Sequence, residues 1–287
     1  MAGAESSDVL VLGATSLVGR FLLPRLAAQG ARVAAVSRRP PAGTHKDVAW
    51  IEGDLADPAL LARLPAVPTV FSLTPIWLLP PALPVLAQPG LRRLVAFSST
   101  SRFTKTRSPD PGERAVAQRL AEGEAAAAAT CEAAGAEWTI LRPTLIYAEG
   151  QDGNVSRLAG LIRRFGVLPL AGRGEGLRQP VHADDLAAGA LAAAASLAAA
   201  NRAYDVPGGE TLTYRDMAVR IFEAVGKPPR IVSAPPWLWR AGLTLASPLL
   251  PGATAGMGVR MAENLTFDPA PAARDFGWAP RAFRPRF

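Results

Sequence analysis

Short apolar runs alternate with amphipathic stretches through the first half of the chain. The runs have the length and composition of strands buried on both faces of a sheet. Between them apolar residues recur at helical spacing, as Leu17, Val18, Phe21, Leu22 and Leu26 do. The expected strands are Val9–Leu12, Arg32–Val36, Val48–Ile51, Thr69–Leu73, Leu91–Phe97 and Trp138–Arg142. This alternation predicts an α/β fold with a doubly wound parallel sheet, of Rossmann type.

The expected helices have recognisable ends. Asp57 precedes Pro58, which is the order of an N-cap followed by a proline in the first turn. The long Ala-rich stretch Glu113–Ala134 is followed by Gly135, where a helix would end. Pro24 fits poorly inside the first helix, because it removes a hydrogen bond and should kink the chain. The apolar spacing around it nevertheless favours a helix.

After Tyr147 the pattern loosens. Helices are expected at Asn154–Phe165, Ala183–Leu197 and Tyr214–Val225, with loops rich in glycine and proline between them. We therefore expect a core over residues 1–150. A smaller C-terminal α/β cap over residues 151–287 would be interleaved with it, because no clean linker separates the two.

The clearest local signal is the segment Gly13-Ala14-Thr15-Ser16-Leu17-Val18-Gly19, which follows the first strand and opens a helix. Glycine at position 13 permits a tight turn, and the small Ser16 lets the backbone approach a pyrophosphate. Gly19 permits close packing of the helix on the strand. Free N–H groups and the helix dipole would hold the phosphates of a dinucleotide. The alternative is an ordinary tight turn between strand and helix.

A second signal follows the next strand, which ends Val36-Ser37-Arg38-Arg39. NAD-specific sites place an acidic residue near this point to accept from the ribose 2′-OH, and this chain has none there. Guanidinium groups match a 2′-phosphate, so the sequence favours NADP(H) over NAD(H). The alternative is that Arg38 and Arg39 are solvated surface charges.

The composition of the chain narrows the kinds of protein and of ligand that it is compatible with. The chain has 287 residues, of which 49% are hydrophobic and 19% charged, so a packed core is expected and disorder is not. Its one cysteine, Cys131, permits no disulfide within the chain, which fits a reducing cytoplasm. The net charge of +7 comes from scattered arginines, which suit phosphorylated small molecules better than nucleic acid.

No leader and no membrane span are expected from the sequence. One apolar segment, Trp237–Leu250, is interrupted by Arg240. We interpret it as a packed helix; a peripheral membrane contact or a partner-binding helix is the alternative.

Five motifs occur in a fixed order along the chain. They are Gly13–Gly19 with Arg20, Gly53-Asp54-Leu55, Phe97-Ser98-Ser99-Thr100, Leu141-Arg142-Pro143-Thr144-Leu145-Ile146-Tyr147 and Val181-His182-Ala183-Asp184-Asp185-Leu186. Together they resemble the short-chain dehydrogenase/reductase superfamily, in its extended or atypical branch of the NAD-dependent epimerase/dehydratase type. The resemblance implies that Asp54 and Leu55 border the adenine, and that Pro143 and Thr144 lie near the nicotinamide.

The same resemblance places Thr100 at the position of the catalytic Ser/Thr. Active members use that hydroxyl with a Tyr-x-x-x-Lys pair on the following helix, where tyrosine moves the proton while hydride moves to or from nicotinamide. Here no tyrosine falls between Thr100 and Pro143, and the helix has no lysine. Lys105 could be recruited, or it could be plain surface charge.

Two residues near the fifth motif are candidates for the substrate side. Arg178 lies four positions before His182, where nucleotide-sugar epimerases use an arginine to contact a diphosphate, so the resemblance implies an anionic or nucleotide-sugar-like substrate. Alternatively, Arg178 pairs with Asp184 or Asp185 to hold the cap on the core. His182 is a candidate acid/base, although a structural or helix-capping role is favoured. The histidines and the single cysteine have no metal-site spacing.

Two functions remain open. The first is an NADP(H)-dependent oxidoreductase or epimerase-like enzyme in which Thr100, Lys105 or a water replaces the tyrosine. The second is a dinucleotide-binding protein without turnover, acting as a redox sensor or as a structural part of a complex. The resemblance also implies a homodimer through the helices flanking the fifth strand, including Glu113–Ala134.

Overall fold

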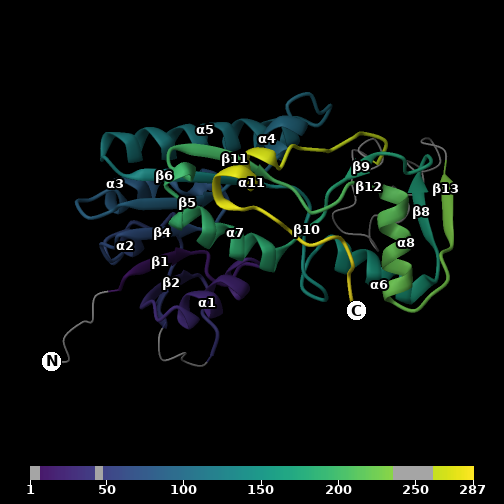
Figure 1. Cartoon of the computed structure of the whole chain (residues 1–287), viewed down its shortest axis with the longest axis horizontal. Helices are drawn as coiled ribbons and strands as arrows, with labels where there is room; N and C mark the ends of the chain where they lie inside the picture. The colour runs from purple at the N-terminus through teal and green to yellow at the C-terminus, as the bar shows by residue number, and fades with distance from the viewer. Residues whose placement is uncertain (1–6, 43–47, 235–260) are drawn as a thin grey trace.

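The computed structural model describes residues 7–42, 48–234 and 261–287 (Figure 1). Its centre is a seven-stranded sheet in the order β11-β6-β5-β4-β1-β2-β3, in which every neighbouring pair is parallel. The strands are β1 (Val9–Leu12), β2 (Val33–Ser37), β3 (Val48–Glu52), β4 (Thr69–Ser72), β5 (Arg93–Phe97), β6 (Glu137–Pro143) and β11 (Arg202–Val206). The predicted α/β doubly wound sheet is confirmed.

Both faces of the sheet are covered, which explains why its strands are apolar throughout. Val9 and Val11 of β1 pack into the core beneath α1 and α7, whereas Leu10 and Leu12 pack into the core beneath α5. All four residues are buried. The helices and 3-10 turns of this half are α1 (Gly19–Ala28), α2 (Pro58–Leu61), η1 (Ile76–Leu78), η2 (Pro80–Ala82), α3 (Leu83–Leu86), α4 (Ser101–Thr104) and α5 (Pro111–Ala133).

Helix ends agree with the sequence in some places and differ in others. The Asp57 carboxylate accepts from the Ala59 amide at 2.9 Å, which is the predicted N-cap of α2. The first helix begins at Gly19, so Leu17 and Val18 lie in the turn before it, and it continues past Pro24 to Ala28. Lys105 follows a short helix, α4, where a loop was expected.

The second half forms the predicted smaller cap at one end of the sheet (Figure 1). Its own apolar core is built from α6, α8 and β8, together with the buried Tyr147 and Phe283. Its elements are β7 (Ile146–Tyr147), α6 (Val155–Phe165), β8 (Leu168–Ala171), β9 (Leu177–Arg178), β10 (Val181–His182), β12 (Leu212–Thr213), α8 (Tyr214–Ala224) and β13 (Ile231–Ala234). They pair as β8 with β13, β9 with β12 and β7 with β10.

The chain returns to the core between these cap elements. Helix α7 (Ala183–Ala195) packs against α1, and it ends at Ala195, two residues earlier than predicted, because Ser196 is extended. The 3-10 turn η3 (Leu197–Ala199) and then β11, which pairs with β6, follow it. The last helix, α11 (Ala270–Phe276), packs on β11. Strand β11 was not predicted, because Arg202 and Asp205 interrupt its apolar pattern.

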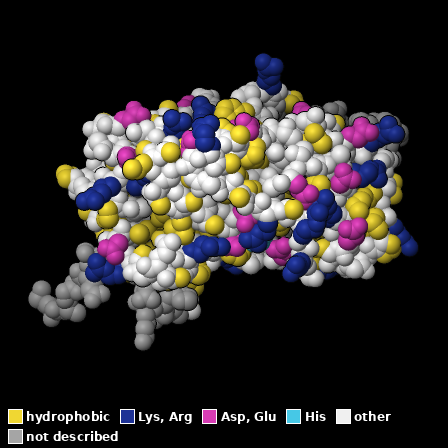
Figure 2. All heavy atoms as spheres, in the orientation of Figure 1, with side chains coloured by type: hydrophobic (Ala, Val, Ile, Leu, Met, Phe, Trp, Pro, Cys, Tyr) yellow, Lys and Arg dark blue, Asp and Glu magenta, His cyan; other side chains and the backbone are white. Residues whose placement is uncertain are grey.

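Charges of both signs are interspersed on the face of the molecule shown in Figure 2, so that face has no continuous basic stripe. None of the helices that the structure describes is both long enough and apolar enough to cross a bilayer. The segment Trp237–Leu250 lies outside the described residues.

Candidate functional site

The loop between β1 and α1 is built so that only glycine fits at its first position. Gly13 has a φ of +71°, and a Cβ placed there would lie 2.9 Å from Thr74 Cγ2 and 3.2 Å from the Leu73 carbonyl carbon. Gly19 approaches the loop itself, since a Cβ there would lie 2.2 Å from the Ala14 carbonyl oxygen. Both glycines therefore allow backbone approaches that no larger residue permits.

The backbone amides of this loop differ in what they bind. Ala14 donates to the Val36 carbonyl at 3.0 Å, and Ser16 donates to that of Gly13 at 2.9 Å. The amides of Thr15, Leu17 and Val18 donate to no acceptor in the described part of the chain. Three such N–H groups at the start of a helix suit an anion, because the dipole adds its positive end there.

Ser16 differs from the glycine found at the middle of the family's phosphate loop. Its hydroxyl accepts a hydrogen bond from the Gly19 amide at 3.2 Å. One amide of the helix start is thus already satisfied by a side chain. The loop fits a pyrophosphate through its remaining amides.

The end of β2 lies next to this loop. Thr15 Oγ1 and Ser37 Oγ are hydrogen-bonded at 2.8 Å, and Ser37 Oγ also accepts from the Arg39 amide at 3.1 Å. The Arg38 side chain is 81% exposed and lies 4.0 Å from the Asp54 carboxylate, while Leu55 is buried. The structure therefore brings Thr15, Ser37, Arg38 and Asp54 together at one corner of the sheet.

Thr100 lies at the carboxyl ends of β5 and β6. Its hydroxyl donates to the Pro143 carbonyl at 3.1 Å, and its amide donates to the same oxygen at 3.2 Å. Thr144 next to Pro143 donates its hydroxyl to the Gln179 carbonyl of the cap. The predicted neighbours Thr100, Pro143 and Thr144 are thus joined, with the Thr100 proton already engaged.

The three tyrosines of the chain are all buried. Burial raises the pKa of Tyr147, of Tyr204 and of Tyr214, and a hydrogen bond to Asp275 raises the pKa of Tyr204 further. Lys105 Nζ lies 3.8 Å from Glu113 Oε1, so its charge is paired on the neighbouring helix.

A buried ionic cluster, which sequence reasoning missed, lies behind Thr100. Glu124 is only 4% exposed, and its carboxylate accepts from Ser98, Arg102 and Arg142. The sequence could have indicated this buried position, because residue 124 has the same helical spacing as the other inward-facing positions of α5. The positions with this spacing are Ala117, Leu120, Glu124, Ala127 and Cys131.

The substrate-side candidates have structural partners. Arg178 is 5% exposed; its Nη1 donates to the carbonyls of Leu177 and Glu263, each at 2.7 Å, and its guanidinium lies 5.6 Å from the Tyr214 ring centroid. The acids considered as its partners bind other arginines: Asp184 pairs with Arg25 and Arg281, and Asp185 with Arg281.

His182 caps α7, because its Nδ1 accepts from the Asp184 amide at 3.0 Å. Its other nitrogen, Nε2, lies 3.1 Å from Glu149 Oε2, and its ring packs against Phe21 and Tyr147. The geometry thus gives His182 the helix-capping role that the sequence favoured.

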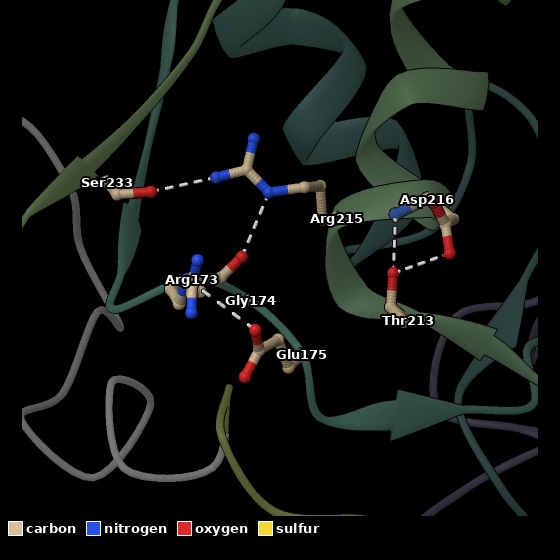
Figure 3. Close-up of a pocket in the computed structure, with 7 residues that line it drawn as sticks. All are labelled: Arg173, Gly174, Glu175, Thr213, Arg215, Asp216 and Ser233. Carbon is tan, nitrogen blue, oxygen red and sulfur yellow. Dashed lines mark hydrogen bonds and ion pairs between the residues drawn. The ribbon is translucent and has the colours of Figure 1, made fainter.

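A cavity of about 420 Å³ lies in the cap, between β8, β13 and the start of α8 (Figure 3). Arg215 spans it, donating to the Arg173 carbonyl at 2.9 Å and to Ser233 Oγ at 2.8 Å. Acidic Glu175 and Asp216 balance its arginines. None of the residues predicted for cofactor or substrate lines it, so we place the candidate site at the edge of the large sheet instead.

Most of the chain is similar to known proteins. Residues 9–72 and 83–206 match the model of a family described as the NAD dependent epimerase/dehydratase family. A solved structure, MoeE5 in complex with UDP-glucose and NAD, superposes with a TM-score of 0.72 at 22% identity, covering 96% of this chain and 94% of that one. At that identity the superposition supports the fold.

Two curated relatives cover almost the whole chain. One, from Streptomyces griseus subsp. griseus, is a (4-alkanoyl-5-oxo-2,5-dihydrofuran-3-yl)methyl phosphate reductase, 31% identical over 93% of this chain and 96% of its own. The other, from Stenotrophomonas maltophilia, is a 2-alkyl-3-oxoalkanoate reductase, 29% identical over 95% of this chain and 94% of its own. With the family match, they indicate an NAD(P)-binding oxidoreductase or epimerase.

Proposed function

Because the chain belongs to the NAD-dependent epimerase/dehydratase family, we propose that it is an NADP(H)-dependent oxidoreductase that reduces a carbonyl group of a small anionic molecule. The observation that carries the proposal concerns the amides of Thr15, Leu17 and Val18 behind the Gly13 turn, which donate to no acceptor among the residues that the structure describes. These donors suit a pyrophosphate, and they lie at the start of α1.

The remaining cofactor contacts follow from the neighbours of this loop. Arg38 and Arg39 at the end of β2 would bind a 2′-phosphate, since guanidinium donors match phosphate oxygens. Asp54 and Leu55 would border the adenine, and Pro143 and Thr144 the nicotinamide end. The bound cofactor would supply the hydride for reduction of the carbonyl.

Thr100 is our candidate for the residue that holds the substrate carbonyl. To donate to a substrate oxygen, its hydroxyl must give up the 3.1 Å bond to the Pro143 carbonyl. Solvent or a bound water would then restore the proton, because no tyrosine or lysine of the described residues is hydrogen-bonded to the Thr100 hydroxyl. Lys105 is the second candidate, and its pairing with Glu113 makes it the less available one.

The substrate class is supported by the two relatives. Both are named as reductases, and the names include an anionic group, a phosphate in one and an alkanoate in the other. The structural contacts of Arg178 and His182 favour roles in holding the cap together. We therefore propose a phosphorylated or carboxylated carbonyl compound rather than a nucleotide sugar.

The test is oxidation of NADPH by the purified protein, followed by nicotinamide absorbance. The probes are a 2-alkyl-3-oxoalkanoate, an alkanoyl-dihydrofuranyl methyl phosphate and UDP-glucose. We expect turnover with at least one of the first two and none with UDP-glucose. Thr100→Ala should lower kcat by about 100-fold, the scale of a lost general acid or hydrogen-bond donor, whereas Lys105→Gln should leave kcat within about threefold.

A second function is favoured by one specific observation, the absence of the Tyr-x-x-x-Lys pair from the helix after Thr100. In this alternative the protein binds the dinucleotide without turnover, as a redox sensor or as a structural component of a complex. Tight binding of NADPH with no oxidation by any of the three probes would support it over the reductase.

A further inference from the structure

We call the segments around Thr100, namely Ser98–Arg102 and Arg142–Pro143, the wall. The carboxylate of Glu124 is a buried charge behind this wall. It lies on the inward face of α5, and only 4% of the residue is exposed. A carboxylate is buried to this extent only when it is paired and hydrogen-bonded, since an unpaired charge loses its hydration without compensation. The partners of Glu124 therefore matter more to the local structure than those of a surface acid.

These partners come from separate segments of the chain. Ser98 Oγ, at the end of β5, donates to Oε1 at 2.5 Å. Arg142 of β6 donates through Nε at 3.0 and 3.1 Å to the two oxygens and through Nη2 at 2.7 Å to Oε2. Arg102 of α4 donates to Oε2 as well. One carboxylate thus joins the end of β5, the end of β6 and the start of α4.

Each of the joined residues stands close in sequence to the Thr100–Pro143 hydrogen bonds. Ser98 lies two residues before Thr100, Arg102 two residues after it, and Arg142 directly before Pro143. Both the amide and the hydroxyl of Thr100 donate to the same Pro143 oxygen. The geometry points to Glu124 as a positioning residue that fixes the Thr100 hydroxyl at the edge of the sheet.

The charges of the cluster explain why its geometry depends on a carboxylate. The guanidinium carbons of Arg102 and Arg142 lie 5.4 and 5.1 Å from the ring centroid of Phe103, so two cations lie close to one ring. Without the negative charge of Glu124, these neighbouring cations would repel each other. Asp205 Oδ1 lies 3.7 Å from Arg142 Nη1, and this is its only ion pair among the described residues. It cannot replace the links to Ser98 and Arg102.

The role of Glu124 in turnover rests on the proposed function, whereas its positioning of Thr100 does not. The first test therefore needs no substrate. Amide hydrogen exchange is measured in the full chain for Glu124→Gln, which keeps the size of the side chain and removes its charge. We expect the Thr100 and Arg102 amides to exchange at least about tenfold faster, because their segment opens more often.

The matched control is Glu132→Gln on the same helix. Glu132 is exposed and accepts from the Trp138 indole at 3.1 Å, so its loss should leave exchange at Thr100 unchanged. The reference elements are β1 and β4, which do not contact Glu124. An unchanged Thr100 amide in Glu124→Gln, or an equal increase in β1 and β4, would overturn the proposal.

Ser98→Ala keeps the test decisive if Glu124→Gln does not fold. It removes a single hydroxyl from the cluster and leaves both ion pairs. We expect it to speed exchange at Thr100 by about threefold, with β1 unchanged. No change at Thr100 in this variant would count against the proposal.

A double-mutant cycle on kcat then distinguishes the positioning of Thr100 by Glu124 from a general effect of Glu124 on protein stability. Glu124→Gln should lower kcat by about tenfold and leave the Kd for NADPH within about twofold. It should lower kcat no further when Thr100 is already Ala, because the effect acts through that hydroxyl. Additive losses would contradict the proposal. Unchanged turnover in Thr100→Ala alone would instead remove Thr100 from the proposed function and leave the exchange result standing.

Discussion

The loop after β1 and the wall around Thr100 lie on the same edge of the sheet and treat their polar groups in opposite ways. In the loop, the amides of Thr15, Leu17 and Val18 have no acceptor within the described structure. In the wall, Thr100 and Glu124 have partners within the fold. The comparison teaches that the amides of the proposed cofactor loop are open to a ligand, whereas the polar groups around the candidate Thr100 are engaged by internal contacts.

The largest expected effect is on cofactor binding by the loop after β1. Gly13→Ala should weaken NADPH binding by about 100-fold, because a Cβ would meet Thr74 at 2.9 Å and the left-handed backbone disfavours alanine. Titration of the purified variant by fluorescence or calorimetry measures this change.

Gly30→Ala is the matched control for that substitution. Gly30 has nearly the same φ, +72°, but a Cβ there would meet nothing within 4 Å. The change should cost about 1–2 kcal/mol of stability and leave the Kd for NADPH within about twofold. Equal losses of affinity in both variants would mean that backbone strain, and not the shape of the phosphate loop, accounts for the result.

A smaller effect is expected on the preference for NADPH over NADH. Replacement of Arg38 and Arg39 by Ala should weaken NADPH binding by about tenfold and leave NADH binding within about twofold, because only NADPH carries the 2′-phosphate. Binding of both cofactors is compared in the same buffer. Parallel losses for both dinucleotides would assign the arginines a structural role.

Ser16→Gly tests the Gly19 amide, which is satisfied by the Ser16 side chain. The substitution removes the hydroxyl that accepts from the Gly19 amide and so frees a further donor for the pyrophosphate. We expect a two- to threefold gain, that is about 0.5 kcal/mol, in NADPH binding. A clear loss of affinity would show that Ser16 supports the loop instead of competing with the ligand.

The smallest expected effect concerns the wall and its pH dependence. Burial raises the pKa of Asp205 above its usual value, and Glu124 adds to this, although Arg142 opposes it. A raised pKa in the folded state contributes stability at low pH that is lost as the pH rises through that pKa. The Asp205→Asn variant has no carboxyl to ionise. As the pH rises from acidic to neutral, its free energy of unfolding should therefore increase relative to that of the wild type. Parallel denaturation curves at all pH values would contradict this.

The fold was largely predictable because its signals are local. Apolar runs located β1 to β6, and the loop between Gly13 and Gly19 depends on neighbouring residues and one strand. Strand β11 escaped prediction because Arg202 and Asp205 are polar, although each has partners in the folded protein.

The wall was less predictable because its contacts join distant segments. Glu124 lies among the inward-facing positions of α5. The residues near it in sequence do not indicate that Ser98 and Arg142 donate hydrogen bonds to it. Arg178 and His182 were found as candidates from their motif, but only the three-dimensional contacts reveal the carbonyls and the helix end that they bind. Sequence patterns therefore located the groups without determining their partners.

Calorimetric titration of the wild-type protein with NADPH and with NADH tests the central claim most directly. The account predicts saturable binding of both, tighter for NADPH, and loss of that binding in Gly13→Ala. Absence of measurable heat with either dinucleotide, in a protein that unfolds cooperatively, would contradict it.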